Sequence, residues 1–142
     1  MKKYILLVVA IIAWFSVQLF KFIADAIKHK RLNFKRLAET GGMPSSHSAV
    51  VTSLMTSLAI KYGVDSPYFA LSFVFGIIVM YDAAGVRRAA GKQAGILNQL
   101  IYSNQVKVDT NEKLKELLGH TPFEVLVGAI WGIVLSFILN KI

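Results

Sequence analysis

The chain has 142 residues, of which 55% are hydrophobic and 17% charged, and its formal net charge is +8. A basic nucleic-acid-binding protein needs a charged surface that faces water, and a chain with a mean hydropathy of +0.55 has too few charges to supply one. Nine Phe, five Tyr and two Trp exclude a disordered chain, and a sequence without Cys has no disulfide or thiolate metal site. The length fits one domain. The remaining class is a small membrane protein whose charges gather in particular places.

Four windows without charged residues are the candidate membrane spans: Tyr4–Phe20, Thr40–Ile60, Ser66–Tyr81 and Val125–Asn140. They are 16 to 21 residues long, whereas a transmembrane helix needs about 20. Flanking aromatic and basic side chains absorb this difference by snorkelling. We therefore expect an all-α integral membrane protein, a single membrane domain over residues 1–142 with a bundle of about four transmembrane helices. The expected spans are approximately 4–24, 46–61, 67–84 and 122–140.

A fifth segment, approximately 86–105, is rich in Ala and Gly and carries polar side chains at helical spacing. Arg88, Lys92, Gly95 and Gln99 fall near one helical face. Small residues let helices approach closely in a bilayer. We expect this polar, small-residue segment to be a helix packed inside the bundle, or a re-entrant helix, rather than a lipid-exposed span. Its small-residue face also leaves a homodimer open without establishing one.

Alternation of four spans places residues 21–47 and 82–124 on one membrane face, and these segments hold nearly every unusual polar group of the chain. They contain twelve of the sixteen Lys and Arg residues. Because loops rich in Lys and Arg stay on the cytoplasmic side, we expect a multi-pass protein of the inner (plasma) membrane. Its polar face would be cytoplasmic and both termini would lie outside. The convergence of distant segments on this face predicts a single site.

The strongest local signal is the run Gly41-Gly42-Met43-Pro44-Ser45-Ser46-His47-Ser48, where a loop meets the second expected span. Glycines allow close approach of the backbone, and a helix N-terminus with free N–H groups binds anions. A histidine at this place can deliver a proton to a leaving oxygen at neutral pH. A serine N-cap beside an interfacial histidine explains the same residues without any ligand.

A second signal is Gly119-His120-Thr121-Pro122-Phe123-Glu124, at the start of the last expected span. His120 and Glu124 are four residues apart and therefore share one helical face. A carboxylate bonded to one ring nitrogen fixes the tautomer and makes the other nitrogen a better nucleophile. A helix-start capping pair is the alternative.

A third signal is Asp82-Ala83-Ala84-Gly85-Val86-Arg87-Arg88, at the end of the third expected span. Adjacent arginines at a membrane surface often meet lipid headgroups, but beside two histidines and a helix start they can clamp a phosphate in a bidentate manner. Lys21, Lys35 and Arg36 can add charge to the same pocket. Asp82 could orient an arginine or hold a metal, and one carboxylate without an acidic partner makes the metal the weaker option.

Together these motifs resemble the type 2 phosphatidic acid phosphatase superfamily, which includes lipid phosphatases and the vanadium haloperoxidases. The blocks GGMPSSHSA, YDAAGVRRAAGKQA and LGHTPFEV are similar to those of its divergent bacterial and plastid branch, whose function is largely unassigned. The resemblance extends from Lys21 to about Gly132. It implies a phosphatidic-acid-phosphatase-like core and a membrane lipid phosphatase that needs neither a metal nor a cofactor.

The resemblance also implies roles for individual residues. His120 would be the nucleophile that forms a phosphohistidine, Glu124 would orient it, and His47 would protonate the leaving lipid alcohol. Ser45 and Ser46 would bind the phosphate. Its charge would be neutralised by Arg36, by Lys21 or Lys35, and by Arg87 or Arg88.

The expected substrate is a lipid phosphomonoester of the phosphatidylglycerol phosphate or phosphatidate class, and the expected partners are membrane lipids, not nucleic acid. Two departures from the family pattern keep alternatives open. Pro-Ser-Ser-His stands where the family usually has Pro-Ser-Gly-His, and Leu114-Lys115 occupies the spacing of the usual Ser-Arg before the nucleophile. The alternatives are a polyprenyl (pyro)phosphate phosphatase and a non-catalytic membrane protein that binds lipid phosphate.

Overall fold

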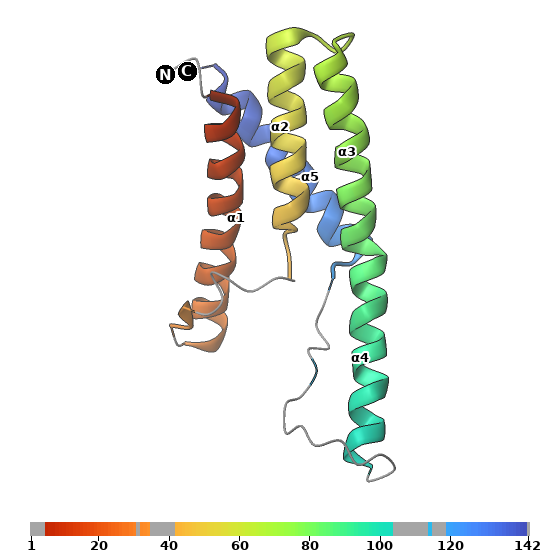
Figure 1. The fold of residues 1–142 in the computed structure, drawn as a ribbon. Helices are drawn as coiled ribbons and strands as arrows, with labels where there is room; N and C mark the ends of the chain where they lie inside the picture. Colours follow the sequence, from red (N-terminus) through yellow and green to blue (C-terminus); the bar gives the residue numbers. More distant parts are fainter. Residues whose placement is uncertain (1–4, 31, 35–41, 104–113, 115–118, 142) are drawn as a thin grey trace.

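The computed structural model describes residues 5–30, 32–34, 42–103, 114 and 119–141 (Figure 1). These residues form five α-helices and no strand, which confirms the predicted all-α class. The helices are α1 (Ile5–His29), α2 (Ser46–Tyr62), α3 (Pro67–Ala84), α4 (Val86–Tyr102) and α5 (Pro122–Leu139). Three helical stretches of the described chain are long and apolar enough to cross a membrane, namely Ile5–His29, Pro67–Tyr102 and Pro122–Leu139.

Local sequence signals set the helix starts. Ser66 caps α3 by accepting a hydrogen bond from the backbone N–H of Phe69 at 3.2 Å, and Pro67 follows in the first turn. Thr121 caps α5 in the same way, with Pro122 next. The fixed φ of proline suits the first helical turn, where no N–H is needed. Gly63, whose φ is +85°, ends α2 in a conformation that favours glycine.

Helix α2 is the centre of the bundle and packs against α1, α3 and α5. Its closest approach is to α5, where Gly128 and Gly132 face α2 without side chains. A Cβ atom on Gly132 would overlap the carbonyl oxygen of Ala49. Small residues at this spacing let two helix backbones pack together within a bilayer.

The buried side of α2 is polar rather than apolar, because Ser48, Thr52, Ser53 and Ser57 all lie within it. A hydroxyl in a membrane interior needs a hydrogen-bond partner. Thr52 donates to the carbonyl oxygens of Ser48 at 2.7 Å and of Ala129 in α5 at 3.0 Å. The hydroxyls of Ser57 and Ser136 lie 2.7 Å apart near the far end of the two helices. These hydroxyls therefore join α2 to α5 without a charged residue.

Large apolar side chains cover the outside of the bundle on α1, α3 and α5. Leu71, for example, is 74% exposed. Contiguous exposed apolar surface of this extent marks a membrane interaction surface in a folded protein. The outer surface is thus suited to lipid, while the polar groups lie inside the bundle or at its ends.

Helix α4 continues the course of α3 and extends beyond the other helices (Figure 1). Gly85 donates to the Tyr81 carbonyl at 2.8 Å and accepts from Ala89 at 2.9 Å, so helical hydrogen bonding passes through the junction. Among the described helices α4 contacts only α3. The segment expected to pack inside the bundle therefore extends past its end (Figure 1), and its placement as a re-entrant helix stays a prediction.

The end of α1, the starts of α2 and α5, and the junction of α3 with α4 lie toward the same end of the bundle (Figure 1). The first residues of α1 and the last residues of α5 lie at the opposite end. Helix α1 runs to His29, further than its expected end at residue 24. The arrangement brings the three sequence motifs to one end of the molecule.

Candidate functional site

Two histidines from distant parts of the chain meet at this end of the bundle. His47 lies in the first turn of α2 and His120 lies just before α5. Their ring centroids are 6.2 Å apart, with an angle of 62° between the ring planes. The Nδ1 atoms of both rings are buried and have no hydrogen-bond partner among the described residues. Two partly buried imidazoles that meet in this way are candidates for one shared functional site.

The loop before α5 fixes His120 against the junction of α3 and α4. The His120 backbone N–H donates to the Ala83 carbonyl at 2.9 Å. Gly119 has a φ of +83°, and a Cβ atom there would overlap the backbone nitrogen of Arg88. Only glycine combines that conformation with so close an approach. His120 itself is 3% exposed.

Ser45 anchors the start of α2 to the first turn of α5. Its backbone N–H donates to the Glu124 carbonyl at 3.1 Å. Its hydroxyl caps the helix by accepting from the Ser48 N–H at 3.3 Å and from the Ser48 hydroxyl at 3.0 Å. Both polar groups of Ser45 are therefore used within the fold, as an N-cap would use them. The third serine, Ser48, was not singled out from the sequence, although its position three residues after the cap is the signal for this bond.

The first N–H groups of a helix have no acceptor within the helix. Among the described residues the Ser45 hydroxyl accepts from the N–H of Ser48, and the backbone N–H groups of Ser46 and His47 come first in α2. Ser46 is buried there and His47 is half-buried. This helix start has the chemistry of an anion site, directly beside the two imidazoles.

One carboxylate oxygen of Glu124, Oε2, contacts both His120 and Thr121. Its Oε2 atom lies 3.4 Å from Nδ1 of His120, within ion-pair range but without the geometry of a hydrogen bond. The same oxygen accepts a hydrogen bond from the Thr121 N–H at 2.9 Å and so completes a capping box. One carboxylate oxygen thus makes the capping bond and also lies beside the histidine ring.

Lys21 brings a positive charge into the same region from α1. Its side chain is buried, with 4% of the residue exposed. Burial and the Lys21 charge lower the pKa of His120 from its usual value, while the Glu124 carboxylate opposes them. The net lowering keeps the His120 ring neutral around neutral pH. A neutral ring can act as a nucleophile, whereas an imidazolium cannot.

The two adjacent arginines, Arg87 and Arg88, have different surroundings in the structure. Arg87 donates from Nε to Oδ2 of Asp82 at 2.8 Å, and both side chains are exposed. The charges of Arg87, Lys21 and Asp82 all act on His47. The side chain of Arg88 is exposed, and its backbone is the part that meets Gly119. Arg87 is therefore the arginine associated with the histidines, held by Asp82.

Of the predicted site residues, those the structure brings together are Lys21, Ser45, Ser46, His47, Asp82, Arg87, His120 and Glu124. Lys35 and Arg36 lie outside the described residues, so their predicted roles stay predictions. The assembly combines two imidazoles, two cationic side chains and a helix start. Groups of these kinds have the chemistry to bind an anion and to transfer protons.

Comparisons with known proteins bear on the family of the chain. The chain matches the model of the family described as "Divergent PAP2 family" over residues 2–135. It is similar to the "Uncharacterized membrane protein YuiD" of Bacillus subtilis (strain 168), with 43% identity over 134 residues that cover 86% of this chain and 85% of the relative. No solved structure matches the chain. The chain is a membrane protein that belongs to the Divergent PAP2 family.

Proposed function

We propose that the protein is a membrane phosphatase that hydrolyses a lipid phosphomonoester of the phosphatidylglycerol phosphate or phosphatidate class through a phosphohistidine on His120. The observation that carries the proposal is the pair of imidazoles with centroids 6.2 Å apart, beside the start of α2 and the buried Lys21. In-line transfer needs a nucleophile on one side of phosphorus and an acid beside the leaving oxygen. Two rings at this separation are suited to those two positions.

In the first step Nε2 of His120 attacks phosphorus, because Glu124 lies beside Nδ1. The bond between phosphorus and the lipid oxygen breaks, and the protonated His47 ring gives its proton to that oxygen. Lys21 and Arg87 stabilise the negative charge that develops on the phosphoryl oxygens. The products of this step are the lipid alcohol and phosphohistidine.

In the second step a water molecule attacks the phosphohistidine and His47 accepts a proton from it. The nitrogen–phosphorus bond breaks, inorganic phosphate leaves and the His120 ring becomes neutral again. His47 is then protonated for the next cycle. Each histidine thus returns to its initial state, and the step uses the chain's own groups for proton transfer.

We further propose that the site opens to the cytoplasmic side of the inner membrane. The two segments that form this end of the bundle carry twelve of the sixteen Lys and Arg residues. The positive-inside rule supports this orientation.

The test is phosphate release by the purified protein in detergent, measured over a panel that includes phosphatidate, phosphatidylglycerol phosphate and a polyprenyl pyrophosphate. Loss of a general acid or a nucleophile costs about 100-fold or more in rate, so His120→Ala and His47→Ala should each lose activity to this extent. His29→Ala is the matched control, because His29 is an exposed ring whose Nδ1 lies 3.2 Å from an Asp25 carboxylate oxygen. Activity that survives both site substitutions, or no activity on any lipid of the panel, would contradict the proposal.

One observation favours a second function, the binding of lipid phosphate without turnover. Glu124 Oε2 is hydrogen-bonded to Thr121, and His120 Nδ1 has no hydrogen bond among the described residues, so the ring lacks a firm orienting partner. A non-catalytic protein would bind phosphatidate and form no covalent adduct. Rapid quenching of the reaction with radiolabelled lipid phosphate, followed by detection of an acid-labile adduct lost in His120→Ala, separates the two functions.

A further inference from the structure

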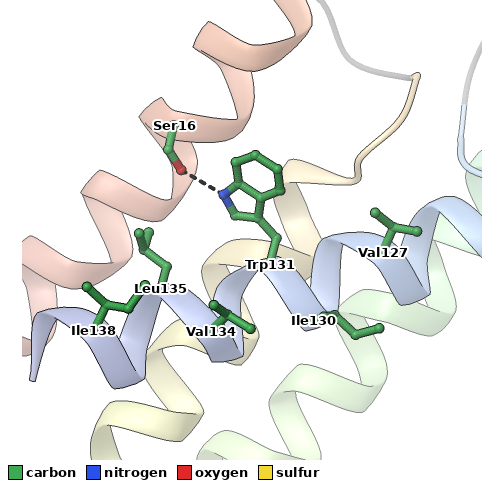
Figure 2. A pocket seen from close by; sticks show the side chains of 7 residues that line it. All are labelled: Ser16, Val127, Ile130, Trp131, Val134, Leu135 and Ile138. Carbon is green, nitrogen blue, oxygen red and sulfur yellow. Dashed lines mark hydrogen bonds between the residues drawn. The ribbon is translucent and has the colours of Figure 1, made fainter.

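An apolar groove of about 430 Å³ lies between α1 and α5. Figure 2 shows the side chains that line it, Ser16 from α1 and the rest from α5. The α5 residues recur every three or four positions and form one helical face: Val127, Ile130, Trp131, Val134, Leu135 and Ile138.

The few polar atoms of the groove are already bonded to one another. Trp131 reaches from α5 to α1 and donates from Nε1 to the Ser16 hydroxyl at 3.0 Å (Figure 2). That hydroxyl donates in turn to the Ala13 carbonyl at 3.0 Å. The groove therefore presents hydrocarbon surface and offers little to a polar headgroup. An alkyl chain is the ligand class that matches such a lining.

The groove begins beside the two-histidine site. Glu124 lies one helical turn before Val127 and two turns before Trp131, on the same face of α5. On α1 the Phe20 ring packs against Trp131 with centroids 5.3 Å apart, and the buried Lys21 follows Phe20 directly. A ligand in the groove thus has its end close to a positive charge and to His120. The groove and the positive charge at its end are complementary to a lipid that carries a negative phosphate on an apolar chain.

The length of the groove fits one membrane leaflet. With a helical rise of about 1.5 Å per residue, Val127 and Ile138 are separated by about 17 Å along α5. Half of a hydrocarbon core of about 30 Å is about 15 Å. The chain of an ordinary membrane phospholipid ends at that depth, whereas a long polyprenyl chain extends beyond it.

We propose that this groove binds one fatty-acyl chain of the lipid whose phosphate lies at His47, His120 and Lys21. The proposal rests on the phosphate site of the proposed function, not on turnover. It adds to that function the place where one acyl chain of the lipid would lie. An acyl chain aligned along α5 would hold the lipid phosphate next to His120, because His120 lies just before the first residue of that helix.

The test uses the full chain in phosphatidylcholine vesicles that contain phosphatidate with a photoreactive diazirine in one acyl chain. After irradiation, labelled peptides are mapped by mass spectrometry. We expect label on the α5 segment Ile130–Ile138, lost on addition of unlabelled phosphatidate and retained on addition of more phosphatidylcholine. Val134→Trp, which fills the groove, should lose this label. Phe137→Trp, which introduces the same side chain at an exposed α5 residue outside the lining, should retain it.

Label displaced equally by phosphatidylcholine would show an annular lipid and overturn the proposal, as would label confined to other helices or a crosslink to a second copy of the chain. The competition experiment uses the wild-type protein and so does not depend on folding of the Val134 variant. Phosphatidate-specific label in a protein without phosphatase activity would support the groove and contradict the proposed enzyme. Activity without that label would support the enzyme and overturn the groove.

Discussion

Oε2 of Glu124 lies 3.4 Å from Nδ1 of His120 and 2.9 Å from the backbone nitrogen of Thr121, so a single carboxylate oxygen links the candidate nucleophile to the start of α5. The cap holds the carboxylate in place, and the carboxylate supplies negative charge beside the ring. Its two contributions can be separated experimentally because they depend on different properties, an acceptor oxygen for the cap and a charge for the histidine.

Glu124→Gln should lower phosphatase activity by about ten-fold or more, because it removes the charge that favours the imidazolium-like ring of the phosphohistidine. It keeps an acceptor for the Thr121 N–H, so thermal stability in detergent should change little. Thr121→Ala should do the reverse and cost about 1 kcal/mol of stability through loss of the cap hydroxyl. Phosphate release and thermal unfolding of both variants check this pair. Equal activity of Glu124→Gln and the wild type would exclude a role of the charge.

The pH dependence of phosphoenzyme formation should report the lowered pKa of His120. Burial and the Lys21 charge disfavour the protonated ring, so the ring stays neutral to a pH below the usual histidine value of 6.5. The rate should therefore fall on the acid side of that value. Lys21→Met removes one cause of the lowering, so the acid limb should move to higher pH. The pH–rate profile measures the position of the limb independently of the reduced binding that the substitution also causes.

Lys61→Met is the control for this shift, because it removes the same charge at the other end of α2 from His47. Its acid limb should coincide with that of the wild type. A Lys61→Met shift as large as that of Lys21→Met would show a general effect of net charge rather than the field of a buried neighbour.

Gly119→Ala should inactivate the protein more than Gly63→Ala does. Both glycines have positive φ, +83° and +85°, so both substitutions strain the backbone similarly. A Cβ atom at Gly119 would also overlap the Arg88 backbone nitrogen, whereas nothing lies within 4 Å of one at Gly63. The extra displacement falls on the loop that holds His120. Activity normalised to folded protein, measured by size-exclusion chromatography, tests the difference, and equal loss in both variants would contradict the close packing.

Gly128→Ala should separate α2 from α5, because its Cβ atom would overlap the Ser45 carbonyl oxygen. Overpacking of this kind costs about 1–3 kcal/mol. Gly76→Ala is the matched control within α3, since its Cβ atom would lie 3.8 Å from Val51 Cγ2, an ordinary contact. Thermal unfolding in detergent should show a lower midpoint for Gly128→Ala and an unchanged or higher one for Gly76→Ala. The reverse order would exclude the α2–α5 seam as the tightest contact.

The all-helical membrane class could be predicted because membrane spans are visible as windows without charge, whatever their neighbours. The meeting of His47 with His120 could be anticipated because alternating spans bring their starts to one side. The course of α4 could not, since it depends on hydrogen bonds that continue through Gly85. The two contacts of the Glu124 oxygen could not be predicted either. The spacing of these residues fits a pair with His120 and a capping box with Thr121 equally well, and only the geometry shows that one oxygen makes both contacts.

The central position of α2 in the bundle also could not be predicted from the sequence. Its window is free of charge, but its Ser and Thr residues make it less apolar than the other spans, and nothing in their spacing indicates that three helices surround it. The structure shows why the polarity is tolerated, since Thr52 and Ser53 donate to carbonyl oxygens one turn earlier in α2 itself. Helix-internal bonds of this kind are available to any serine or threonine in a span.

The enclosure of α2 has a consequence for biogenesis. Thr52 and Ser53 carry their acceptors with them, so most of the helix can enter lipid as soon as it leaves the translocon. The hydroxyl of Ser57 differs, because its partners are Ser136 in α5 and the amide of Asn140, which caps α5, and α5 is synthesised after α2. We therefore expect the end of α2 that carries Ser57 to reach its final position only after α5 has inserted. Until then α2 would be held between α1 and α3 alone.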